Sequence, residues 1–178
     1  MKKRLILISL GFLTGCAVTP PPMSVEELRA EVRSNPSRIQ VEEYEVERPF
    51  LPAFNAVQTN AERCFEVTLS KIQENTPDAR PESLRYRAES FMTSETEGET
   101  FLQLDKKAAQ RMPEGGYYVL LADIEAISAK KTRVTVYRAM RGYDTVNESI
   151  VAWAQGKSDH CPKFPKDAQD WRLTNHNP

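Results

Sequence analysis

The chain is poor in the residue types that most enzymes use for chemistry. It has 178 residues but only two histidines, His160 and His176, and three cysteines, Cys16, Cys64 and Cys161. A zinc site needs several His, Cys, Asp or Glu side chains that converge, and a cysteine nucleophile needs a free thiol of low pKa beside a base. His160 adjoins Cys161, but this pair is too isolated in the sequence to indicate either kind of site. We therefore expect no metal, no cofactor, and histidines that are solvated or hydrogen-bonded.

Motifs that bind phosphate or mark a hydrolase are also missing. The only adjacent glycines, Gly115 and Gly116, belong to a turn-forming segment rather than to a phosphate-binding loop. No G-x-S-x-G motif of a serine hydrolase occurs. Asp123 and Glu125 share one face of an apolar strand, and paired carboxylates can perform acid–base catalysis. The alternative is that the strand twists so that this end faces water, and we expect no enzymatic activity.

No excess of basic residues is present, with 24 lysines and arginines against 25 aspartates and glutamates. They do not gather on one predicted face, so we expect no nucleic-acid partner. The segment 138–143 (RAMRGY) contains two arginines that could meet an anionic partner, or it is a solvated strand end. Four tyrosines near predicted strand ends fit either an interface or ordinary sheet positions: Tyr117, Tyr118, Tyr137 and Tyr143.

The apolar run that could meet a membrane lies at the start of the chain. Residues 2–4 (KKR) are positively charged, residues 5–13 (LILISLGFL) are apolar, and the small residues Thr14 and Gly15 follow. This three-part order is typical of a signal peptide. The apolar run is much shorter than the about 20 residues that a permanent transmembrane helix needs. We therefore predict that residues 1–15 form a signal peptide.

Leu13-Thr14-Gly15-Cys16 resembles the lipobox of bacterial lipoproteins. The resemblance implies that the chain is cut before Cys16 and that this cysteine then carries the lipid that anchors the protein. Several acyl chains give an anchorage that a single chain cannot give. Ala17 stands where an aspartate would signal retention in the inner membrane, so the resemblance implies an outer-membrane protein that faces the periplasm.

Assigning Cys16 to the lipid leaves Cys64 and Cys161 as an even pair in an oxidising compartment. We predict a disulfide between them. It would close a loop of roughly 100 residues and stabilise the fold by up to about 4.7 kcal/mol in the chain-entropy model. The alternative is a pair of unrelated buried thiols.

The mature chain divides into four further segments. Residues 16–23 form the lipidated cysteine and a proline-rich tether, which favours an extended conformation. Residues 24–37 form a short, mostly charged helix and a linker, with Ser24 and Glu27 as a capping box. This helix is docked loosely or free. Residues 38–162 form the globular domain, and residues 163–178 a polar tail draped on the surface or disordered.

Hydrophobic periodicity places two helices and six strands in the globular domain. The first helix spans residues 50–64, where Phe50, Phe54, Val57 and Ala61 recur every three or four positions. The second begins at a capping box in residues 145–148 and ends at Gly156. Alternating or apolar segments predict strands at 39–47, 65–70, 84–93, 100–106, 117–128 and 132–140. A change of phase in the first strand indicates a bulge or a sheet edge.

This order, β-α-β-β-β-β-β-α, predicts an α+β domain. We expect a curved antiparallel sheet of about five to six strands, with the two amphipathic helices on one face and the disulfide joining them. The order of elements is similar to helix-grip arrangements, although a fold does not define a function. We expect a non-enzymatic envelope lipoprotein that binds a protein partner or envelope assembly. The alternative is a carrier of apolar ligands with a cavity between helices and sheet.

Overall fold

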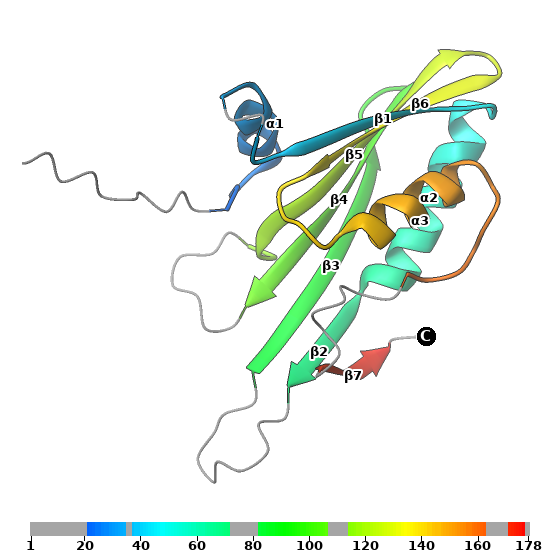
Figure 1. Ribbon diagram of the computed structural model, residues 1–178. Coiled ribbons are helices and arrows are strands. Elements are labelled where there is room, and N and C mark those ends of the chain that lie inside the picture. The colour runs from blue at the N-terminus through cyan, green and yellow to red at the C-terminus, as the bar shows by residue number, and fades with distance from the viewer. Residues whose placement is uncertain (1–20, 35–36, 72–81, 107–113, 163–170, 177–178) are drawn as a thin grey trace, which may run out of the picture.

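A computed structural model describes residues 21–34, 37–71, 82–106, 114–162 and 171–176 (Figure 1). The expected lipidation site Cys16 and most of its tether lie outside these residues. The protein is an α+β fold in which three helices pack on one open, curved antiparallel sheet. The elements are α1 (Val25–Ser34), β1 (Gln40–Val46), α2 (Phe50–Phe65), β2 (Val67–Lys71), β3 (Glu82–Met92), β4 (Glu97–Lys106), β5 (Tyr117–Ser128), β6 (Lys131–Arg138), α3 (Asp144–Ala154) and β7 (Trp171–His176).

The sheet has the strand order β1-β6-β5-β4-β3-β2-β7, and every neighbouring pair is antiparallel. The predicted order β-α-β-β-β-β-β-α is confirmed from β1 to α3. β1 lies at one edge and pairs with β6 without a register shift, so the edge explains its change of phase and no bulge is needed. The prediction for the C-terminal tail is corrected, because β7 pairs with β2 and adds a seventh strand at the other edge.

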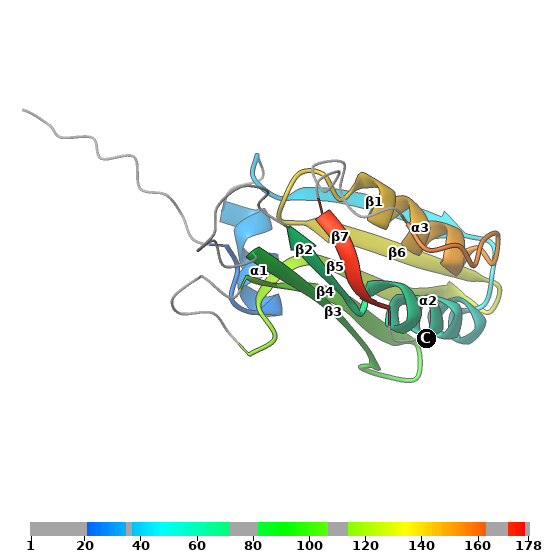
Figure 2. The ribbon, with the colours of Figure 1, turned by 90° about the horizontal axis from the view of Figure 1, so that it is seen from below.

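Helices α2 and α3 cover one face of the sheet, which we call the inner face (Figure 2). α2 buries the predicted stripe of Phe50, Phe54, Val57 and Ala61, and α3 buries Trp153 against it. These side chains meet the inward residues of β3 to β6, since alternate residues of a strand point to the same face. The layer is closely packed: a Cβ placed on Gly98 of β4 would come within 2.5 Å of the Phe54 ring.

Helix α1 packs on the opposite, outer face of the sheet. Leu28 and Val25 are buried there against a small cluster formed by Ile39, Phe101, Leu121 and Ala139. The Ser24 hydroxyl accepts the backbone N–H of Glu27, and the Glu27 carboxylate accepts the N–H of Met23. The capping box is therefore present, and the structure decides the open question of docking: α1 is packed on the sheet rather than free.

The start of α3 differs from its prediction. The helix begins at Asp144 after Tyr143, and no side chain caps it, so the predicted capping box at Thr145–Glu148 is wrong. Tyr143 is buried and its hydroxyl lies 3.2 Å from that of Tyr86, while Asp144 pairs with Arg138. Tertiary contacts of these two residues fix the first turn. The end of α3 agrees with the prediction, since Gly156 follows it with a φ of 69°.

Candidate functional site

The two carboxylates that could have formed a catalytic pair lie on the outer face of β5, and each is held by an arginine. Arg29 Nη2 on α1 donates to Asp123 Oδ1 at 2.6 Å and to Glu99 Oε1 at 2.7 Å. Burial opposes the charge of Arg29, but these hydrogen bonds prevail and raise its pKa. Arg133 Nη1 donates to Glu125 Oε1 at 2.6 Å. Asp123 therefore links β5 to α1, and Glu125 links β5 to β6, so both carboxylates have a structural role.

These ion pairs belong to a larger group of charges on the part of the outer face next to α1. We call this group the anionic face. It contains seven carboxylates and three cations, a formal excess of four negative charges: Glu43, Glu45, Glu47, Glu97, Glu99, Asp123 and Glu125, with Arg29, Lys131 and Arg133. Glu95 and Lys130, in the two adjoining hairpin turns, balance each other.

Each cation of the anionic face is shared between two carboxylates. Arg29 serves Glu99 and Asp123, as described above. Arg133 adds to its bond with Glu125 a contact from Nε to Glu43 Oε1 at 3.1 Å. Lys131 Nζ lies 2.7 Å from Glu47 and 3.8 Å from Glu45, and its hydrogen bond to Glu47 raises its pKa. Each group of three therefore keeps one net negative charge. Glu97 forms no ion pair within the described part of the chain.

The sheet register places carboxylates of like charge side by side. Glu97 lies directly opposite Glu125, and Glu99 directly opposite Asp123, on the neighbouring strands β4 and β5. Like charges in directly opposed positions destabilise a sheet by a few tenths of a kcal/mol up to about 1 kcal/mol. Arg29 and Arg133 offset part of this cost. Of the two pairs, Glu99 and Asp123 share the cation Arg29, whereas Glu97 opposite Glu125 has no cation of its own among the described residues.

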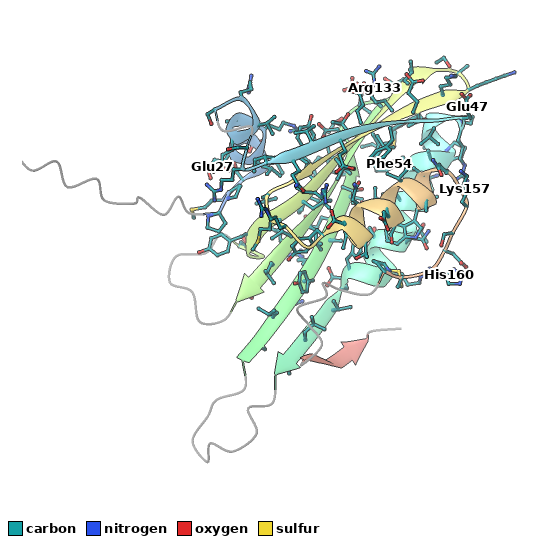
Figure 3. The ribbon with its side chains drawn as sticks, viewed as in Figure 1. Glu27, Glu47, Phe54, Arg133, Lys157 and His160 are labelled. Carbon is teal, nitrogen blue, oxygen red and sulfur yellow. A yellow bond between two sulfur atoms is a disulfide. The ribbon has the colours of Figure 1, made fainter. Side chains whose placement is uncertain are left out.

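A hollow of about 190 Å³ opens among these carboxylates. Its wall combines the guanidinium of Arg29 with residues of the β3–β4 hairpin and of β5: Thr93, Glu97, Gly98, Glu99, Asp123, Ile124 and Glu125. Phe91, which pairs with Glu99 across β3 and β4, is 44% exposed at its border, and its ring lies 6.1 Å from that of Phe101. Figure 3 shows Arg133 and Glu47 at the opposite end of the strands from Glu27 of α1.

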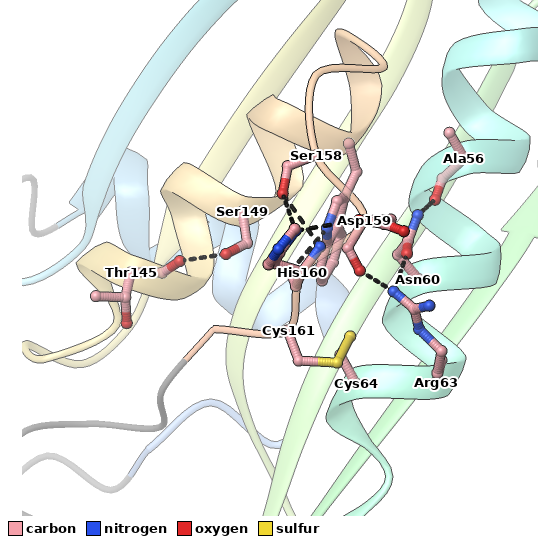
Figure 4. Close-up of a disulfide and its surroundings, with 11 residues drawn as sticks. Ala56, Asn60, Arg63, Cys64, Thr145, Ser149, Ser158, Asp159, His160 and Cys161 are labelled. Carbon is pink, nitrogen blue, oxygen red and sulfur yellow. Dashed lines mark hydrogen bonds and ion pairs between the residues drawn. A yellow bond between two sulfur atoms is a disulfide. The ribbon is translucent and has the colours of Figure 1, made fainter. Parts of the chain in front are cut away.

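The predicted disulfide joins Cys64 and Cys161, with their Cα atoms 5.1 Å apart (Figure 4). Cys64 is buried at the last turn of α2, and Cys161 is exposed in the segment after α3. His160 is 89% exposed, and its Nδ1 lies 3.1 Å from Asp159 Oδ1. No free thiol stands beside this histidine, so the arrangement is that of a covalent crosslink. The His176 side chain lies outside the described part of the chain.

Only one of the two arginines of segment 138–143 is exposed, Arg141. Arg138 is 4% exposed and pairs with Glu42 on β1 and with Asp144 on α3. Asn147 Nδ2 donates to Glu42 Oε2 at 2.9 Å and to the Tyr44 hydroxyl at 3.0 Å. The hydrogen bond from Tyr44, with the charge of Arg138 nearby, lowers the pKa of Glu42. This polar cluster, in which Arg138 and Asn147 are buried, links α3 to the edge of the sheet. No local pattern indicated this cluster, because its members are far apart in the chain.

The tyrosines near the strand ends are mostly structural. Tyr118 and Tyr137 pack against the cluster under α1, and burial followed by the charge of Asp123 raises the pKa of Tyr137. Tyr143 is buried in the core beside Tyr86, and burial raises its pKa strongly. Tyr117 is half-buried at the start of β5. Their sheet and core contacts favour the ordinary structural interpretation over an interface.

Comparison with known proteins gives no family. No protein-family model matches the chain, and no curated protein matches it either. The candidate site therefore stands on its own geometry. Across the described ranges, no three or more His, Cys, Asp or Glu side chains converge in a way that could hold a metal ion. The helices in those ranges are also too short or too polar to cross a membrane.

Proposed function

We propose that the protein is a lipid-anchored lipoprotein of the bacterial envelope whose periplasm-facing domain has no catalytic role and binds a protein partner. Residues 1–15 would be removed as a signal peptide, and Cys16 would carry the lipid. The disulfide between Cys64 and Cys161 supports this location, because structural disulfides persist in oxidising compartments. The absence of an aspartate at position 17 supports the outer membrane.

The observation that carries the binding role is the uncompensated charge of the anionic face, of which the candidate catalytic residues Asp123 and Glu125 are members. Asp123 and Glu125 are engaged by arginines, and Cys161 is engaged by Cys64. The anionic face as a whole keeps an excess of charge that its own cations do not neutralise. Clustered exposed charge of one sign favours association with a complementary surface.

The alternative role as a carrier of apolar ligands lacks such support. Between the helices and the sheet, the described aromatic side chains pack closely: the Phe54 ring lies against Gly98, and the ring centroids of Phe65 and Trp153 are 5.2 Å apart. The hollow of about 190 Å³ is lined by carboxylates on the outer face, away from that layer. Ligand pockets for drug-sized molecules are usually about 300–1,000 Å³ and mostly apolar.

Two experiments test the proposal. Metabolic labelling with a fatty acid should label the wild-type protein, and Cys16→Ala should abolish the label and release the protein from the membrane fraction. Chemical crosslinking in intact envelopes should give the same adducts with a protein partner in repeated preparations. An unlabelled protein would refute the anchor. A protein recovered only without adducts, under conditions where a known envelope complex crosslinks, would refute the binding role.

A further inference from the structure

The part of the outer face next to α1 is a sheet surface without a covering element among the described residues, and its three cations neutralise fewer than half of its seven carboxylates. Arg29, Arg133 and Lys131 each serve two carboxylates. Glu97, exposed at the start of β4, adds a further negative charge beside the hollow. A partner that brings positive charge to this surface would complete the three groups and relieve the repulsion between opposed carboxylates.

Apolar side chains lie beside these charges. Phe91, at the end of β3, is 44% exposed, and Ile127, at the end of β5, is 39% exposed. The Phe91 ring is positioned by Phe101, which is buried under α1, so a partner would meet it in a fixed orientation. Aromatic side chains with a fixed ring contribute strongly to protein interfaces.

We propose that the anionic face, with Phe91 at its border, is the docking surface for a segment of a partner protein that carries several lysines or arginines and an apolar side chain. This inference rests on the proposed function and names the surface and the chemistry of the partner. The apolar side chain would lie on Phe91, and one cationic side chain would enter the hollow beside Glu97.

Charge and geometry argue against two other occupants. A lipid surface rich in anionic headgroups would be repelled, and so would the same face of a second copy of this chain. The tether also reaches the domain near the start of β5, where the Tyr118 N–H donates to the Pro22 carbonyl at 3.2 Å. Glu125 lies close to the other end of that strand. The part of the anionic face around Glu125 therefore lies at the opposite end of β5 from the point where residue 22 meets the domain.

A peptide titration tests the chemistry. The full chain in a neutral detergent is titrated into two labelled eight-residue peptides, one alternating Arg and Leu, the other Gln and Leu, with fluorescence anisotropy as the readout. The arginine peptide should bind, more weakly at about 0.15 M salt than at low salt, because screening shortens the range of exposed charges. The triple variant Glu45→Gln, Glu47→Gln, Glu97→Gln should weaken binding at least about fivefold, since each exposed pair contributes modestly.

A matched variant controls for net charge. Glu62→Gln, Glu114→Gln and Glu148→Gln remove the same number of exposed carboxylates away from the anionic face. This control should bind the arginine peptide within about twofold of wild type. Equal losses in both triple variants, or equal binding of the glutamine peptide, would overturn the inference.

A second experiment separates this inference from the proposed function. A photo-crosslinking amino acid replaces Phe91 in one strain and Leu51, which is 50% exposed on α2, in another. An adduct at Phe91 whose crosslinked peptide contains lysines or arginines supports the docking surface. An adduct that forms only at Leu51 would refute the docking surface but would still support the proposed binding of a protein partner. If no adduct forms at either position, and none forms with chemical crosslinkers, both the docking surface and the proposed binding role are refuted.

Discussion

Replacing Leu28 by alanine should release helix α1 from the sheet without unfolding the domain. Leu28 is fully buried against the outer face, and a helix of ten residues is not stable alone in water. Its docking depends on Leu28, Val25 and the two ion pairs of Arg29. Burying a leucine side chain contributes about 1.5–3 kcal/mol, whereas ion pairs near the surface usually contribute up to about 1 kcal/mol each, and those of Arg29 are half-buried. Leu28 is thus the main contributor.

The magnitude follows from the cost of truncating a buried leucine. Leu→Ala substitutions in packed sites cost about 2–5 kcal/mol. Taking the lower value, the population in which α1 is undocked should rise about 30-fold, since about 1.4 kcal/mol corresponds to a factor of ten. Terminal elements open locally, so the effect should be confined to α1 and the sheet residues beneath it.

Native-state hydrogen exchange is the appropriate assay. Amides of residues 24–34 in Leu28→Ala should exchange about 30 times faster, while those of β5 beyond Leu121 keep their wild-type rates. Arg33→Ala is the matched control, because Arg33 is exposed on the same helix. Unchanged exchange in Leu28→Ala, or an equal increase in Arg33→Ala, would refute the view that apolar burial holds α1 in place.

Three further predictions concern the rest of the domain. Replacing both Cys64 and Cys161 by alanine should lower the free energy of unfolding by about 4 to 5 kcal/mol, because the disulfide closes a loop of 97 residues. The wild type in strong reductant should show the same loss in its denaturant unfolding curve. The pKa of Glu42 is lowered in the folded state, so this carboxylate should stabilise the fold above its ordinary pKa of 4.5. That stabilisation should be lost as the pH falls through the folded-state pKa. Glu42→Gln should therefore flatten this part of the curve of unfolding free energy against pH. Gly98→Ala should lower the free energy of unfolding by about 1–3 kcal/mol, because the new methyl group meets the Phe54 ring. Adding Phe54→Leu to the same chain should recover part of this loss, measured by calorimetry. If the destabilisations of the two single variants simply add in the double variant, the contact is contradicted.

The helices and strands of the globular domain were predictable because local patterns describe them. The three- and four-residue spacing of α2 gave its extent to within one residue, Phe50–Phe65 against the predicted 50–64. The apolar run of β5 gave both of its ends, Tyr117 and Ser128. These elements bury one continuous face, so each local pattern agrees with the final packing.

The candidate site was less predictable. Asp123 and Glu125 were recognised as neighbours on one face, but their partners Arg29 and Arg133 come from a helix and a strand far away in the chain. α1 shows only a few apolar side chains among charges, so its docking depends on outer-face residues that the sheet register brings together. The cluster around Arg138 likewise needs β1, β6 and α3 in place.

The sequence alone determined two features of the protein: an N-terminal segment that resembles a lipoprotein signal, and an α+β domain crosslinked between Cys64 and Cys161. Both follow from local composition, from hydrophobic periodicity or from the number of cysteines, and none of these depends on the tertiary structure. Only the tertiary structure decided that α1 is docked, that 171–176 joins the sheet, and that six carboxylates share three cations on one face beside Glu97, which pairs with no described cation. The physical reason is that charge balance depends on which strands are neighbours and in which register, and pairing between distant segments sets both.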